Sequence, residues 1–344
     1  MDHIDKPGHD SDAQSDRTYQ PEHSGMYELE FPAPQLSSAD GRGPVLMHAL
    51  EGFSDAGHAI KLAAEHLRKS LDTELVASFA IDELLDYRSR RPLMTFKTDH
   101  FTHYDDPELN LYALHDSVGT PFLLLAGMEP DLKWERFITA VRLLADRLGV
   151  RRTIGLGAIP MAVPHTRPVT LTAHANNREL ISEHTPWVGE VQVPGSVSSL
   201  LEYRMAQHGH EVLGFTVHVP HYLAQTDYPE AAKALIEHAA GASSLDIPLG
   251  GLDEAAAEIR IKIDEQVEAS PEVAQVVTAL ERQYDAFVAA QENRSLLARD
   301  EDLPSGDELG AEFERFLAQQ AGETPDQFRD DPFKEDPFTD DGTT

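Results

Sequence analysis

The clearest pattern along the chain is an apolar run at residues 45–50 that leads through a glycine-flanked segment into an amphipathic helix. The run VLMHAL is nearly continuous, as expected for a parallel strand covered on both faces. Helical spacing of apolar positions follows in Ala56, Ala59, Ile60, Ala63 and Leu67. Because ligands of open α/β sheets bind beyond the carboxyl ends of strands, the pattern predicts a site whose rim contains Glu51, Gly52, Ser54, Asp55 and Gly57.

The rest of the first 250 residues alternates between predicted strands and helices. Apolar runs predict strands near Met26 and at 74–81, 93–98, 109–116, 121–127, 151–160, 169–175 and 211–220. Helical stripes begin at Trp134, Ser196 and Tyr228. Strand, helix and strand at this spacing form parallel crossover units. The pattern predicts an α/β fold, a three-layer sandwich around a mixed sheet, with polar excursions at 82–108 and 160–168 overhanging the strand ends.

From residue 251 the pattern changes to amphipathic helices with an acidic surface. Two stripes run through 252–267 and 273–287, and a third helix is predicted from Ser305, where a capping box reaches Glu308. Residues 251–344 contain 25 of the 60 acidic residues but only 8 of the 28 basic ones. The predicted organisation is a disordered arm at 1–24, an α/β core at 25–250, an acidic helical region at 251–320 and a disordered acidic tail at 321–344.

Charge and composition exclude several classes of function. A formal charge of −32 repels nucleic acid and anionic membrane surfaces, so neither is an expected partner. The chain has no cysteine, which excludes disulfides and thiolate chemistry. The first residues contain no apolar core of a signal peptide, and no apolar run approaches the roughly 20 residues that span a bilayer. These features predict a cytoplasmic protein.

The segment GFSDA at 52–56 allows two interpretations. It follows a strand and precedes a helix, as a hydrolase nucleophile elbow does, with Ala56 in place of the last glycine. In an enzyme Ser54 would be the nucleophile, with Glu51 nearby and His165 or His218 as the base. The simpler interpretation is that Ser54 or Asp55 caps the helix and that the glycines permit a tight turn.

Two further segments offer candidate contacts. The glycines Gly155 and Gly157 in GLGAIP follow an apolar run but lack the third glycine of a dinucleotide fingerprint, so we expect close backbone packing there. The proline-flanked loop 163–168 presents His165 and Arg167 as an anion or partner contact. Short histidine spacings do not lie on a helix with a catalytic glutamate, so neither a metal nor another cofactor is expected.

Five segments together resemble the proteasome assembly chaperone 2 family, in particular its actinobacterial branch. They are LEGFSDAGHAIKLAAEHL at 50–67, MEPDLKWERF at 128–137, GLGAIPMAVPHTRP at 155–168, TAHANN at 172–177 and LPSGDELGAEFERFL at 303–317. The match extends over roughly residues 25–320. The resemblance implies a phosphorylase/hydrolase-like α/β core with a helical C-terminal addition and association into a small homo-oligomer.

The resemblance also implies a role. Better understood members assist the assembly of proteasome α-subunits, often through a C-terminal hydrophobic–tyrosine–any motif, whereas this sequence ends in DDGTT. The leading hypothesis is a non-enzymatic binding or assembly protein that associates with itself and with a proteasome-related protein, with the helices after residue 251 contributing contacts. The alternative is a hydrolase or ligase-like enzyme of unknown substrate that uses the loops at 51–57 and 155–168.

Overall fold

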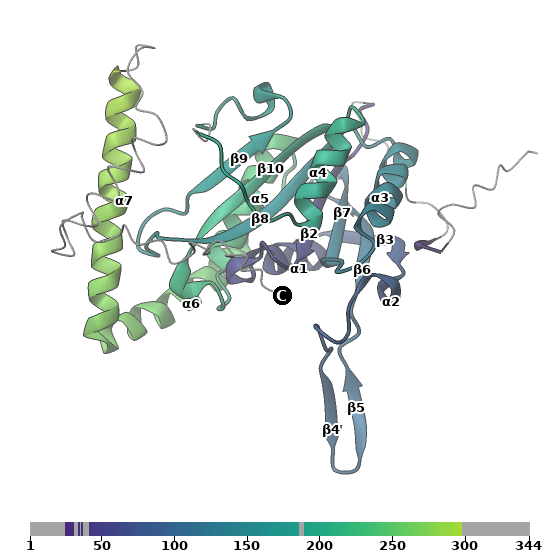
Figure 1. Ribbon diagram of the computed structural model, residues 1–344, viewed down its shortest axis with the longest axis horizontal. Helices are drawn as coiled ribbons and strands as arrows, with labels where there is room; N and C mark the ends of the chain where they lie inside the picture. The colour runs from purple at the N-terminus through teal and green to yellow at the C-terminus, as the bar shows by residue number, and fades with distance from the viewer. Residues whose placement is uncertain (1–24, 31–33, 35, 37–40, 186–188, 298–344) are drawn as a thin grey trace, which may run out of the picture. The chain divides into compact units, whose positions relative to one another are not determined.

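An eight-stranded mixed sheet organises the fold (Figure 1), in the order β1-β3-β6-β7-β2-β8-β10-β9. The computed structural model describes residues 25–30, 34, 36, 41–185 and 189–297. The strands of this sheet are β1 (Tyr27–Leu29), β2 (Val45–Glu51), β3 (Asp72–Phe79), β6 (Leu109–His115), β7 (Pro121–Met128), β8 (Arg152–Met161), β9 (Leu171–Ala175) and β10 (Glu211–Pro220).

The four central strands β7, β2, β8 and β10 run parallel to one another, and the outer strands pair antiparallel. Such strands are buried on both faces, which explains their nearly continuous apolar sequence. Their carboxyl ends therefore meet at one edge of the sheet, where Glu51 of β2 lies beside Met128 of β7.

Helices cover both faces of the sheet and produce two separate apolar cores. Helices α1 (Ala59–Ser70), α5 (Pro229–Ser243) and α6 (Gly250–Ala269) pack with one face, and α3 (Trp134–Leu148) and α4 (Val197–Gln207) pack with the other. Alternate residues of β2 belong to different cores, Met47 to the first and Leu46 to the second. The α/β prediction with a layer of helices on each face is confirmed. The phosphorylase/hydrolase-like label stays a prediction.

The predicted excursion at 82–108 has more structure than its polar sequence indicated. After the short helix α2 (Ile81–Leu84), strands β4 (Met94–Lys97) and β5 (His100–Tyr104) form a two-stranded sheet of their own (Figure 1). The prediction of one strand at 93–98 is thus incomplete, because its hydrogen-bonding partner is β5 and not the main sheet. Every residue of this hairpin is exposed.

Much of the predicted stripe on α6 is covered by the chain itself. Leu252 and Ile263 are buried in the core shared with α1 and α5, and Ile259 and Val267 pack against it. Helix α7 (Pro271–Leu297) follows, and its residues from 287 onward belong to a second compact unit, whose other described residues are 189–193. The arm at 1–24, the predicted helix from Ser305 and the tail lie outside the described residues. None of the helices that the structure describes is long and apolar enough to cross a membrane.

A row of four residues in register crosses strands β2, β8, β10 and β9. His48 pairs with Gly155, Gly155 with Gly214, and Gly214 with His174. The carboxylate of Glu202, from α4, lies over the two glycines: it is hydrogen-bonded to Nε2 of His174 and lies 3.5 Å from Nε2 of the fully buried His48. Burial lowers the pKa of His48.

This row explains why Gly155 is a glycine. A Cβ at this position would lie 1.9 Å from Oε1 of Glu202. Gly155 and Gly157 lie inside β8 and not in a turn at its end, and a Cβ at Gly157 would lie 3.0 Å from Oγ1 of Thr216. For Gly155 the packing partner is a charged side chain, which the sequence did not indicate.

The first prediction concerns this packing. Gly155→Ala should lower the free energy of unfolding by about 1–3 kcal/mol, because the new methyl group displaces the Glu202 carboxylate from His174. Gly241→Ala is the matched control: no atom lies within 4 Å of its added Cβ, and alanine in helix α5 should be neutral or stabilising by up to about 1 kcal/mol. Urea unfolding at equal protein concentration measures both. Equal stability of the two variants would contradict the packing argument.

Candidate functional site

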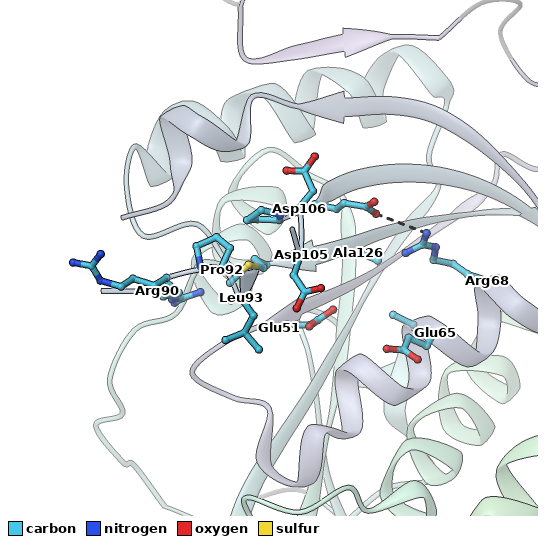
Figure 2. A pocket seen from close by; sticks show the side chains of 15 residues that line it. Glu51, Glu65, Arg68, Arg90, Pro92, Leu93, Asp105, Asp106 and Ala126 are labelled. Carbon is cyan, nitrogen blue, oxygen red and sulfur yellow. Dashed lines mark ion pairs between the residues drawn. The ribbon is translucent and has the colours of Figure 1, made fainter. Parts of the chain in front are cut away.

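A cavity of about 420 Å³ lies at the carboxyl ends of β2 and β7 (Figure 2). Its walls come from β2, β7, helix α1 and the two segments that lead into and out of the β4–β5 hairpin. The charged side chains that line it are Glu51, Glu65, Arg68, Arg90, Arg91, Asp105, Asp106 and Glu108. Its size is within the range of small-ligand pockets.

Glu51 is the one residue of the predicted rim that lines this cavity. Its side chain is half-buried, and it forms no hydrogen bond or ion pair with any residue that the structure describes. Burial raises the pKa of its carboxyl group, an effect that the positive charge of Lys61 opposes. The strand thus holds a carboxyl group in the cavity without a bonded partner.

The arginines of the cavity, in contrast, are mostly engaged. Arg68 lies 3.8 Å from Glu108, and its guanidinium group lies 4.4 Å from the centre of the Tyr112 ring. Arg90 forms an ion pair with Asp131 at 2.9 Å and donates a hydrogen bond to the Glu129 carbonyl. These contacts hold both side chains in the wall and leave less of their charge for a ligand.

Glu129 holds the turn after β2, a role that the sequence analysis missed. This buried carboxylate accepts hydrogen bonds from the backbone N–H of Phe53 at 2.9 Å and of Val197, at the start of α4, at 2.6 Å. Gly52 packs directly against it, since a Cβ there would lie 2.2 Å from Oε2. The signal was a glutamate directly after a buried strand, where a charged residue must find partners.

The next residues of the turn are occupied by helix capping and backbone pairing. Oδ1 of Asp55 accepts a hydrogen bond from Ile60 N–H at 2.7 Å, near the start of α1. The backbone carbonyl of Ser54 accepts a hydrogen bond from the N–H of Ala158. Gly57 has a φ of +67°, which favours glycine, and its N–H donates to the Ala224 carbonyl. The N-cap position of α1 is His58, and of the two candidates that the sequence left open, Asp55 is the one whose side chain accepts a hydrogen bond from the start of the helix.

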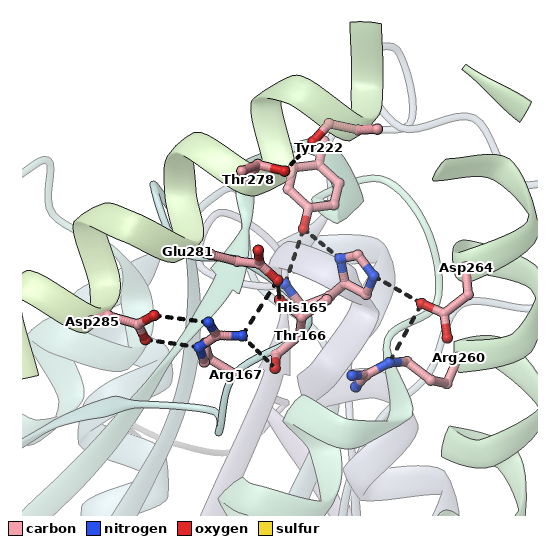
Figure 3. Close-up of polar contacts among 10 residues, drawn as sticks. His165, Thr166, Arg167, Tyr222, Arg260, Asp264, Thr278, Glu281 and Asp285 are labelled. Atoms are coloured by element: carbon pink, nitrogen blue, oxygen red, sulfur yellow. Dashed lines mark hydrogen bonds and ion pairs between the residues drawn. The ribbon is translucent and has the colours of Figure 1, made fainter. Parts of the chain in front are cut away.

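His165 faces α6 and is not open to a ligand (Figure 3). Its ring is buried, with Nδ1 2.7 Å from the Tyr222 hydroxyl and Nε2 3.2 Å from the Asp264 carboxylate. Since a carboxylate accepts, Nε2 carries the proton, and the Tyr222 hydroxyl donates to Nδ1. The same hydroxyl oxygen accepts from the backbone N–H of His165.

Arg167 is likewise bound to the helical region (Figure 3). Its guanidinium group holds both carboxylate oxygens of Asp285 at 2.8 Å and lies 3.3 Å from Glu281, both on α7. This two-pronged geometry is the strong form of an arginine–carboxylate contact. The loop 163–168 therefore anchors α6 and α7 to the core.

The candidate residues do not form one catalytic group. Glu51 lines the cavity, but Ser54, His165 and Arg167 are absent from its walls and have the partners described above. The other candidate base, His218, lies between the hydroxyl groups of Thr170 and Thr172. Within the described part of the chain, no group of three or more histidine, aspartate or glutamate residues could hold a metal ion.

The PAC2 family model matches residues 49–267, more than half of the chain, from the last three residues of β2 into α6 and including the loop 163–168. The chain belongs to the PAC2 family. The family resemblance read from the motifs is thereby confirmed. None of the curated proteins matches this member of the PAC2 family.

Solved structures agree with the membership. A Mycobacterium tuberculosis protein of unknown function is 77% identical, covers 89% of this chain and 99% of its own, and has a TM-score of 0.79. A Corynebacterium glutamicum protein of unknown function is 43% identical, over 76% of this chain and 98% of its own, with a TM-score of 0.74. A Mycobacterium tuberculosis proteasome-assembly chaperone homologue is 24% identical over 68% of this chain and 99% of its own, with a TM-score of 0.62, and shares the fold.

The second prediction tests whether the side chain of Ser54 or that of Asp55 stabilises the start of α1. Asp55→Ala should cost about 1 kcal/mol of unfolding free energy, because it removes the acceptor for Ile60 N–H. Ser54→Ala is the matched neighbour and should change stability by less than about 0.5 kcal/mol. Thermal unfolding followed by circular dichroism measures both. A larger loss in the serine variant would reverse the assignment of the cap.

The third prediction concerns the anchoring of α7. Arg167→Gln should speed amide hydrogen exchange in residues 278–286, because the guanidinium contacts to Asp285 and Glu281 are lost. Arg142→Gln, which removes only a pair with Asp146 within helix α3, is the control and should leave α7 unchanged. Exchange measured by mass spectrometry decides. Unchanged protection in the Arg167 variant would show that apolar packing alone holds the helix.

Proposed function

We propose that this PAC2 family member is a non-enzymatic binding or assembly protein that associates with itself. Family membership supports a chaperone-like role at the level of the family. The expected setting is the cytoplasm, with a second copy of this chain and a proteasome-related protein as partners. The formal charge of −32 favours protein partners over nucleic acid.

The observation that carries the proposal is the apolar surface of the β4–β5 hairpin. Phe96 and Phe101 are 58% and 61% exposed, their ring centres lie 5.1 Å apart, and they pair across the two strands. Leu93, Met94 and Tyr104 are also exposed. An isolated two-stranded hairpin is marginal in water, and several exposed apolar side chains on one hairpin favour a protein-binding surface. A second copy that covers the patch would stabilise the hairpin and remove its apolar area from water.

This assigns self-association to a different element from the one that the sequence favoured. The sequence predicts that the helices after residue 251 contribute contacts, because their apolar stripes are more than one chain is expected to cover. In the structure α6 covers much of its stripe with the chain's own core. Ile261, Val276 and Phe287 of these helices stay exposed. We favour the hairpin because its two exposed phenylalanines contact each other and none of its residues packs on the core.

The hydrolase or ligase alternative lacks comparable support. An elbow serine needs a base within hydrogen-bonding reach. The ring nitrogens of both candidate bases lie within hydrogen-bonding distance of groups other than Ser54. His165 contacts Tyr222 and Asp264, and His218 contacts Thr170 and Thr172.

The fourth prediction tests the hairpin. Replacement of both Phe96 and Phe101 by serine should turn an oligomer into a monomer in sedimentation velocity, because two apolar anchors are lost from the contact. Val118→Ser, which removes a 75% exposed apolar side chain from the turn between β6 and β7, should leave the oligomer intact. A monomeric wild type, or an unchanged oligomer in the double variant, would contradict the proposal.

A further inference from the structure

Some of the charged side chains that line the cavity at the ends of β2 and β7 have a bonded partner within the chain, and others do not. Arg68 and Arg90 have the acidic and aromatic partners described above. Among the acids, Glu65 pairs with Lys69 at 2.7 Å, and Asp105 is hydrogen-bonded to Nε2 of His103 at 2.8 Å. Most of the charged side chains in the cavity wall thus have a bonded partner within the protein.

Three lining charges have no ion pair or hydrogen bond among the described residues, and they differ in burial. Arg91 and Asp106 are exposed on the rim, where water solvates them, and their opposite signs offset each other. Glu51 is half-buried, so it has lost part of its hydration without gaining a bonded partner. The unmatched charge inside the cavity is therefore negative.

The surroundings of this carboxyl group specify the ligand further. The methyl group of Ala64 and the side chains of Leu93 and Met128 also line the cavity. An apolar wall next to a carboxylate suits a cation with a short aliphatic stem, since the stem packs on the wall while the head pairs with the acid. The nearby charges that act on Glu51 are Lys61, Asp55, Glu65 and Arg68.

We propose that this cavity binds an alkyl ammonium or guanidinium group through Glu51, supplied either by a basic side chain of a second copy or by a free amine. The inference deepens the proposed binding role and rests on it. The ionised carboxylate pairs with the cation and recovers the electrostatic stabilisation that it lost on burial. The acidic protein as a whole also raises the local concentration of cations.

Calorimetric titration tests the site with N-acetyl-lysine N-methylamide as the probe and the uncharged norleucine analogue as its match. The lysine probe should bind wild-type protein saturably, and Glu51→Gln should weaken binding at least about tenfold. The norleucine analogue should bind neither protein measurably. Glu74→Gln, which removes an exposed acid of β3 that does not line the cavity, should change binding by less than about twofold.

The pH dependence gives a second readout. Only the ionised carboxylate attracts the probe, and burial places the pKa of Glu51 above the ordinary glutamate value of 4.5. Binding should therefore be complete near neutral pH and weaken as the pH falls through this raised pKa. Glu51→Gln should fold with an equal or higher thermal midpoint, because a neutral amide costs less to bury than an unpaired carboxylate.

Sedimentation of Glu51→Gln distinguishes the two sources of the cation. A basic side chain from a second copy would make this variant assemble more weakly, and the lysine probe would compete with assembly of the wild type. A free amine would leave assembly unchanged while the probe binds. The inference is wrong if Glu51→Gln alters neither probe binding nor assembly. That failure would leave the hairpin test untouched, because the hairpin test depends on Phe96 and Phe101.

Discussion

Burial of the central parallel strands on both faces is the constraint on which the rest of this protein depends. Strand β2 lies between β7 and β8 and sends alternate side chains into two different cores, so helices must cover both sides. Parallel pairing then brings the carboxyl ends of β2 and β7 together. Glu51, the last residue of β2, is in this way carried to the edge of the buried sheet, where solvent reaches it only in part.

Polar groups inside this apolar framework fix the positions of the helices on the sheet. Glu129 joins the turn after β2 to the first residue of α4. Glu202 of the same helix lies over Gly155 of β8 and Gly214 of β10. Each carboxylate is nearly removed from water, so each must keep its hydrogen bonds. These two contacts specify the position of α4 more closely than apolar packing alone could, because apolar contacts are not directional.

The same requirement separates the surface groups that the chain itself pairs or covers from those that it does not. The loop 163–168 gives its histidine and arginine to α6 and α7, which removes them as candidate ligand contacts. The hairpin and Glu51, in contrast, present apolar side chains and a carboxyl group that no described residue covers or pairs with. This contrast is the basis on which the hairpin and the cavity at its base are proposed as binding surfaces.

The sequence by itself determined the order of strands and helices, the α/β class, the family and the position of Glu51 at a strand end. These features are local, because apolar periodicity reports which face of each element is buried. Only the tertiary structure decided the partners: Phe53 reaches Glu129 across 76 residues of sequence, and Arg167 reaches Asp285 across 118. The sequence around a hydrogen-bonding side chain does not indicate which distant residue will be its partner. The roles of Gly155, Glu129 and the β4–β5 hairpin therefore emerged only once register and packing had brought distant segments together.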